Sequence, residues 1–132
     1  MADSGREGKK KRVLIVDDEE TVGIGMAEIL RDAGFDATYV TNGRDAVDNM
    51  EEYPAALVFM DMMMPGMNGL ETFRRIKEVT SDVKVVLFTG YFRDVDRAIY
   101  QGVKEGMIDI SIRKPFFADE IVRAAKKYTA EA

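Results

Sequence analysis

Residues 13–20 have the sequence VLIVDDEE, which contains a short apolar run followed by four acidic residues. A run of four apolar residues, three of them β-branched, is typical of a strand that is buried on both faces of a parallel sheet. The acidic residues that follow end the strand, and Glu19 and Glu20 suit a first helical turn, where negative charge stabilises the helix dipole. We therefore predict a buried strand over 13–16 and a helix that begins near Glu20.

The same alternation of apolar runs and helical segments continues to the end of the chain. Further strands are predicted at 37–40, 57–60, 83–88 and 108–112. Helical periodicity predicts helices at about 20–33, 44–52, 70–79, 95–103 and 118–128. Alternating strands and helices imply a parallel sheet with helices on both faces. The chain is therefore predicted to be a single α/β domain with a doubly wound, five-stranded parallel sheet.

Residues that favour helix ends stand at several of these boundaries. Asn42 and Asn68 precede the second and third helices, and an asparagine side chain can accept a hydrogen bond from a free backbone N–H there. Gly34 follows the first helix, at a position that often adopts a left-handed backbone conformation. These local signals agree with the boundaries that periodicity predicts.

The composition excludes several classes of function. The chain of 132 residues is 46% apolar, enough for one buried core, and contains neither cysteine nor histidine. Disulfides, thiolate or histidine metal sites, Ser-His triads and a phosphohistidine are therefore excluded on this chain. Any bound metal needs oxygen ligands, which favours Mg²⁺ or Ca²⁺. No apolar run approaches the ~20 residues of a membrane helix, so we expect a cytoplasmic protein that does not bind membranes.

Charge is distributed unevenly along the chain. The formal net charge is −5, while residues 1–12 contain five basic and two acidic residues and so carry +3, which leaves −8 for the remainder. An acidic body is a poor surface for nucleic acids, so no direct nucleic-acid partner is expected. We interpret residues 1–11 as a flexible basic tail and residues 12–130 as the folded domain.

Polar residues stand at the ends of four predicted strands. The first strand is followed by Asp17 and Asp18, the third by Asp61, the fourth by Thr89 and Gly90, and the fifth by Lys114 and Pro115. Ligands of open α/β sheets bind at the carboxyl ends of the strands, which meet at one edge. Each motif alone is more often structural, but their joint placement predicts a functional site.

The residue types at that edge suit phosphoryl transfer to a carboxylate. Three clustered carboxylates repel one another unless a cation lies among them, and Mg²⁺ is a natural choice. A carboxylate beside such an ion can attack phosphorus and form an acyl phosphate. The Lys114 ammonium, the Thr89 hydroxyl and the Gly90 backbone N–H can then donate to the phosphoryl oxygens.

Four motifs together resemble the response-regulator receiver domains of two-component signalling. The sequence VLIVDDEE at 13–20 is similar to their opening, and DMMMPGMNG at 61–69 resembles their D-x-x-M-P-x-x-x-G signature. Thr89-Gly90 and Lys114-Pro115-Phe116 match their hydroxyl and lysine motifs. The resemblance covers about residues 12–128 and implies a flavodoxin-like topology with strand order 2-1-3-4-5.

The resemblance also implies a phosphoacceptor switch that catalyses only its own phosphorylation and dephosphorylation. Asp61 would accept the phosphoryl group from a sensor histidine kinase or a phosphotransfer protein. Lys114 would pair with the phosphoryl oxygens, Thr89 would move toward them, and the Lys114–Pro115 bond is expected to be cis. A downstream protein partner would bind the face formed by the fourth helix, fifth strand and fifth helix.

A set of metal ligands follows from the same resemblance. Asp18 and Asp61 would bind Mg²⁺ directly, together with the backbone carbonyl of Met63. Asp17 would act largely through a bound water. The methionines of this segment suggest no copper or haem site, because soft-metal sites usually include Cys or His as well.

Two features depart from the family pattern. Ser111 stands three positions before Lys114, where receivers usually carry an aromatic residue, and Tyr91 or Phe92 is a candidate replacement. The stretch from Thr89 to Lys114 is also a few residues longer than usual. We expect the extra residues in the fourth helix or in the loop that follows it, around 102–106.

Two alternative functions remain open on the sequence alone. Phosphatases of the haloacid dehalogenase type use similar residues, but their general acid stands two positions after the nucleophile, where this chain has Met63, which cannot transfer a proton. A receiver-like module that is never phosphorylated would serve only as a docking surface. The intact acidic set argues against this second alternative.

Overall fold

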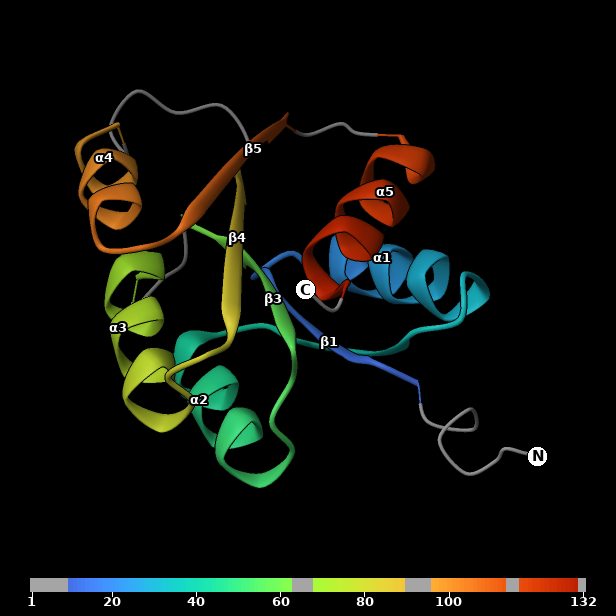
Figure 1. Cartoon of the computed structure of the whole chain (residues 1–132), viewed down its shortest axis with the longest axis horizontal. Coiled ribbons are helices and arrows are strands. Elements are labelled where there is room, and N and C mark those ends of the chain that lie inside the picture. The colour runs from blue at the N-terminus through green and yellow to red at the C-terminus, as the bar shows by residue number, and fades with distance from the viewer. Residues whose placement is uncertain (1–9, 63–67, 90–95, 114–116, 131–132) are drawn as a thin grey trace.

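The computed structural model describes residues 10–62, 68–89, 96–113 and 117–130. Strands and helices alternate along the whole chain (Figure 1). The strands are β1 (Arg12–Val16), β2 (Asp36–Val40), β3 (Leu57–Asp61), β4 (Lys84–Thr89) and β5 (Ile108–Arg113). The helices are α1 (Glu20–Asp32), α2 (Gly43–Glu52), α3 (Gly69–Val79), α4 (Asp96–Lys104) and α5 (Ala118–Thr129). The predicted order of elements is confirmed.

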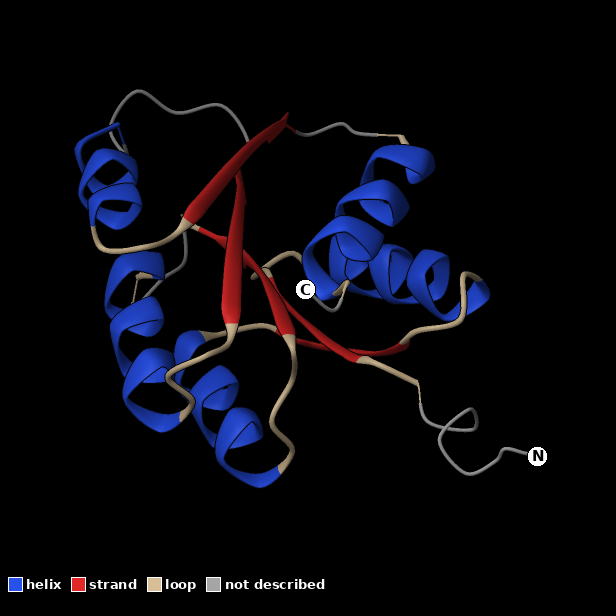
Figure 2. Cartoon of the chain, viewed as in Figure 1, coloured by secondary structure: helices blue, strands red, loops and turns tan. Residues whose placement is uncertain are grey.

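All strand pairs of the sheet are parallel, and the strand order is β2-β1-β3-β4-β5. β2 lies on one side of β1 in the sheet. The chain then crosses to the other side of β1, where β3, β4 and β5 follow in sequence order. Figure 2 shows α1 and α5 on one face of the sheet and α2, α3 and α4 on the other. The doubly wound parallel sheet predicted from the sequence pattern is confirmed, and so is the flavodoxin-like strand order that the resemblance to receiver domains implied.

Each central strand contributes to two hydrophobic cores, one on each face of the sheet. Leu14 of β1 and Val58 of β3 lie in the core beneath α2 and α3, whereas Ile15 and Phe59 lie in the core beneath α1 and α5. Successive residues of a strand point to opposite faces, so a strand buried on both sides must be apolar throughout. This double burial is the reason for the continuous apolar runs in the sequence.

The predicted helix caps form in the structure. The side-chain oxygens of Asn42 and Asn68 accept hydrogen bonds from the backbone N–H groups of Asp45 (2.8 Å) and Glu71 (2.9 Å). Gly34 follows α1 with a φ of 99°, the left-handed conformation that favours glycine. None of the helices within the described ranges is both long enough and apolar enough to cross a lipid bilayer.

The pairing between β4 and β5 is not in continuous register. Leu87 pairs with Asp109 and Thr89 pairs with Arg113, so two steps along β4 correspond to four steps along β5. β5 therefore has an irregularity between Asp109 and Arg113, of the kind that a bulge produces. The location of the extra length around 102–106 stays a prediction.

Candidate functional site

The carboxyl ends of β1, β3 and β4 meet at one edge of the sheet. Asp17 directly follows β1, and Asp61 is the last residue of β3. Pairing of Val16 with Met60, and of Asp61 with Phe88, brings these strand ends level with one another. The parallel register therefore places the acidic residues of two distant segments at the same end of the sheet.

Three predicted site residues come together at this edge. Asp17, Asp18 and Asp61 each offer one carboxylate oxygen, and these oxygens all lie within 4.8 Å of one another. Asp17 and Asp61 are buried, with exposed fractions of 0% and 2%, while Asp18 is exposed. Buried carboxylates at such short separations need a compensating positive charge. Oxygen donors open to solvent on one side fit a hard divalent cation such as Mg²⁺.

Two hydrogen bonds to backbone groups, one in the loop after β1 and one at the end of β2, hold Asp17 in place. The backbone N–H of Glu19 donates to Oδ1 of Asp17 at 2.8 Å, and the backbone N–H of Asp17 donates to the carbonyl of Val40 at 3.2 Å. The carbonyl of Glu19 in turn accepts hydrogen bonds from the first turn of α1. The carboxylate of Asp17 is thus oriented by the same loop that starts the helix.

The end of β3 is packed closely against a glycine of α3. A Cβ atom on Gly69, the first residue of α3, would lie 2.7 Å from Cα of Met62 and 2.9 Å from the carbonyl oxygen of Asp61. Only glycine allows the first turn of α3 to approach the backbone of Asp61 this closely. Sequence reasoning gave Gly69 no role, although its place in the 61–69 motif was a signal.

Glu20, which follows the acidic residues of the cluster, is hydrogen-bonded to Tyr39 of β2. The hydroxyl of Tyr39 donates to Oε2 of Glu20 at 3.1 Å, and its ring lies directly against Gly23 of α1. Because Glu20 accepts this hydrogen bond, the pKa of Tyr39 is raised above its ordinary value. Glu20 lies in the first turn of α1, as predicted, and is not among the three clustered carboxylates.

The remaining predicted site residues are described only in part or not at all. Thr89 ends β4, and its backbone pairs with Arg113, but its side chain and that of Ser111 lie outside the described part of the chain. Five more residues lie outside it altogether, namely Met63, Gly90, Tyr91, Phe92 and Lys114. Their roles stay predictions.

Apolar side chains are exposed on the predicted partner-binding face. Tyr100 and Val103 on α4 are 66% and 44% exposed, and Phe117, directly before α5, is 75% exposed. The ammonium of Lys104 lies 5.4 Å from the centre of the Tyr100 ring. Single exposed apolar residues are ordinary on protein surfaces, but these two aromatic rings lie on α4 and at the start of α5, the helices that form the predicted face.

Comparison with known proteins gives a consistent result. The sequence model of the response regulator receiver domain matches residues 13–126. Sporulation initiation phosphotransferase F of Bacillus subtilis is 34% identical over 118 residues, covering 89% of this chain and 93% of that protein. Chemotaxis protein CheY of Thermotoga maritima is 32% identical over 118 residues, covering 89% and 96%.

A solved structure agrees with this assignment. The crystal structure of a CheY-like response regulator receiver domain protein from Methanospirillum hungatei superposes with a TM-score of 0.80 at 30% sequence identity. The superposition covers 92% of this chain and 95% of that one. Sequence and topology therefore agree, and the chain belongs to the family of response regulator receiver domains, the phosphoacceptor switches of two-component signalling.

Proposed function

We propose that Asp61 accepts a phosphoryl group from a histidine kinase or a phosphotransfer protein, with Mg²⁺ bound by the adjacent carboxylates. The observation that supports this proposal best is the gathering of Asp17, Asp18 and Asp61 within 4.8 Å at the carboxyl edge of the sheet. Receiver domains as a family are phosphoacceptors that interact with such kinases and bind Mg²⁺ through an acidic cluster. A kinase of this kind uses ATP, so the proposed setting is the cytoplasm.

The proposed metal site uses three carboxylates in unequal ways. Asp18 and Asp61 would bind Mg²⁺ directly together with the backbone carbonyl of Met63, and Asp17 would act through a water. When bound, Mg²⁺ supplies positive charge that offsets the repulsion among the acids and stabilises the charge of the transferring group. The hydrogen bond from the Glu19 N–H keeps one oxygen of Asp17 turned toward the loop.

In the proposed transfer, a carboxylate oxygen of Asp61 attacks the phosphorus of a phosphohistidine on the partner. The new P–O bond forms as the P–N bond breaks, and the partner imidazole leaves with the bonding electron pair and takes up a proton. Lys114, Thr89 and the Gly90 N–H would donate hydrogen bonds to the phosphoryl oxygens. The fold supports this role, since Gly69 and the strand pairing of β3 fix the backbone of Asp61 beforehand.

The acceptor can be identified with a small phosphodonor. Incubation with acetyl phosphate and Mg²⁺, followed by borohydride trapping and mass spectrometry, should label Asp61 and no other residue. Asp61→Asn should keep the fold but remain unlabelled, because the amide is nearly isosteric but a poor nucleophile. The matched control is Asp119→Asn, which removes an exposed carboxylate of α5 and should label like the parent. Labelling of another residue would refute the assignment.

The same experiment bears on the two alternative functions. A phosphatase would turn over a phosphomonoester repeatedly, whereas Met63 at the general-acid position leads us to expect no multiple turnover. A module used only for docking would not be labelled by acetyl phosphate at all. The proposed protein partner of the phosphorylated form binds the exposed aromatic residues Tyr100 and Phe117 on α4 and before α5.

We further propose that residues 12–130 form the receiver domain and that residues 1–11 are a basic tail. The described elements run from Arg12 to Thr129, which supports the domain bounds. A hydrogen bond holds the last residue of the tail, Lys11, against the domain: its ammonium donates to the carbonyl of Thr129 at the end of α5. A positive charge at this position complements the dipole of α5.

A further inference from the structure

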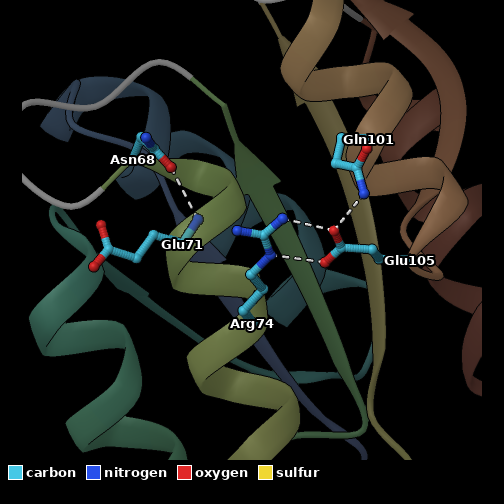
Figure 3. Close-up of polar contacts among 5 residues, drawn as sticks. All are labelled: Asn68, Glu71, Arg74, Gln101 and Glu105. Carbon is cyan, nitrogen blue, oxygen red and sulfur yellow. Dashed lines mark hydrogen bonds and ion pairs between the residues drawn. The ribbon is translucent and has the colours of Figure 1, made fainter.

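An ion pair joins α3 to the end of α4. Nε and Nη2 of Arg74 donate to the two carboxylate oxygens of Glu105 at 2.8 Å and 2.6 Å, and Nε2 of Gln101 donates to the same carboxylate at 2.7 Å (Figure 3). We call these three residues the α3–α4 clamp. The side chains of Arg74 and Glu105 are 51% and 28% exposed. A bidentate pair of this kind is held in one geometry, unlike most surface ion pairs.

Backbone hydrogen bonds and tight packing fix the segment 102–107, which contains the end of α4 and the turn after it. The N–H of Gly106 donates to the carbonyl of Val103, and the N–H of Met107 donates to that of Gly102. Gly106 has a φ of 115°, which ends the helix. A Cβ atom on Gly102 would lie 2.5 Å from the sulfur of Met107, which is buried in the core. The C-terminal end of α4 therefore has little room to shift.

The other end of α3 is seated against the acceptor. Gly69 packs directly on the backbone of Asp61 and Met62. The Asn68 side chain caps the first turn of α3 by accepting a hydrogen bond from the N–H of Glu71 (Figure 3). Arg74 lies between this turn and the end of α3 at Val79. One helix thus contacts the acceptor strand at its first residue and holds α4 through a charged side chain further along.

We propose that the α3–α4 clamp makes the C-terminal end of α4 a pivot: phosphorylation shifts the part of α4 before Gln101 and leaves residues 101–107 in place. This inference rests on the proposed phosphoacceptor function. Tyr100 lies on the side of the pivot that moves, and Val103 lies within the anchored segment. A partner that distinguishes the two states would then sense the position of Tyr100 and not that of Val103.

The test is amide hydrogen exchange, resolved by NMR, on the parent, Arg74→Met, Glu105→Gln and the double variant. Without a phosphoryl analogue, both single variants should speed exchange at 101–107 by ~3-fold, the effect expected for loss of a well-formed ion pair. The double variant should exchange no faster than either single variant, because both remove the same interaction. Asp119→Asn, which removes an ion pair within α5, should leave exchange at 101–107 unchanged.

Beryllofluoride with Mg²⁺, a mimic of the phosphoryl group, supplies the second comparison. In the parent, exchange should change at 96–100 and stay constant at 101–107, whereas in Glu105→Gln the change should extend through 107. A change that already spans 101–107 in the parent would overturn the pivot, as would unaltered exchange in the clamp variants without the analogue. If beryllofluoride changes nothing near Asp61 in any variant, the proposed acceptor fails, while the first comparison still decides whether the clamp anchors α4.

Discussion

At the scale of single residues, the proposed acceptor Asp61 packs against a glycine, Gly69, that offers no side-chain chemistry of its own. An alanine at position 69 would place a methyl group 2.7 Å from Cα of Met62 and 2.9 Å from the carbonyl oxygen of Asp61. The first turn of α3 or the backbone of Asp61 must then shift. Because a small misplacement of a reacting group is costly, we expect Gly69→Ala to slow labelling by acetyl phosphate ~10-fold or more.

Gly25 provides the control for this prediction. It lies on α1 with nothing within 4 Å of an added Cβ atom. Gly25→Ala should leave labelling unchanged and should stabilise the fold by ~0.5–1 kcal/mol, since alanine loses less backbone entropy in a helix. Equal labelling rates for the two alanine variants would show that the close packing of Gly69 does not position Asp61.

The lifetime of the phosphorylated state should depend on two further residues, Met63 and Tyr91. Both lie outside the described part of the chain. They stand two positions after the acceptor and two after Thr89, and in the family such side chains border the path of the attacking water. Both are bulky and lack a carboxylate or amide to orient that water, so slow self-dephosphorylation is expected. The double variant Met63→Asn, Tyr91→Glu should decay ~10²-fold faster in Mg²⁺. Decay at the parent's rate would contradict this interpretation.

At the scale of secondary-structure elements, prediction succeeded where the cause is local. The apolar run of β3 was recognisable because Phe59 and Val58 are buried on opposite faces of the sheet. The caps at Asn42 and Asn68 were predictable because the acceptor and the N–H it binds are three residues apart. In both cases the sequence near the element contains the whole physical reason for it.

Features that depend on distant segments were missed. The irregularity of β5 is defined by its pairing with β4 and has no local sign in residues 108–112. Arg74 and Glu105 are 31 positions apart, and in the sequence Arg74 looks like an ordinary surface charge of α3 and Glu105 like one just after α4. The gathering of Asp17 and Asp61 was predictable only because the topology of parallel sheets brings strand ends to one edge.

The clamp between α3 and α4 gives a pH-dependent prediction. Its hydrogen bonds from Arg74 and then from Gln101 lower the pKa of Glu105 from 4.5 to about 2. A carboxyl group with a lowered pKa stabilises the folded state above its unfolded pKa, and this stabilisation is lost as pH falls from about 4.5 through about 2. An NMR titration should place the midpoint of the Glu105 carboxyl carbon near 2, and Arg74→Met should move it back toward 4.5. A parent midpoint near 4.5 would mean that the ion pair is not formed in solution.

At the scale of the whole molecule, repulsion among the carboxylates at the sheet edge lowers the free energy of unfolding, which the two hydrophobic cores raise. Hydrophobic side chains fill both faces of the sheet, but two buried carboxylates and a third beside them repel one another at its carboxyl edge. Folding brings these charges together, whereas the unfolded chain keeps 17–18 and 61 apart. Binding of a divalent cation should therefore be linked to folding, because the unfolded chain has no preformed site.

This linkage predicts that Mg²⁺ stabilises the fold through the same residues that would carry the chemistry. At a concentration of ~100 times its dissociation constant, Mg²⁺ should raise the free energy of unfolding by ~2.7 kcal/mol, measured by urea denaturation against an EDTA reference. Asp18→Ala should abolish this gain and should be no less stable than the parent in EDTA, because one of three repelling carboxylates is removed. Asp119→Asn should retain the full gain, since Asp119 lies on the exposed surface of α5. If Mg²⁺ stabilises Asp18→Ala as much as the parent, the cation binds elsewhere and the carboxylates of the sheet edge are not its site.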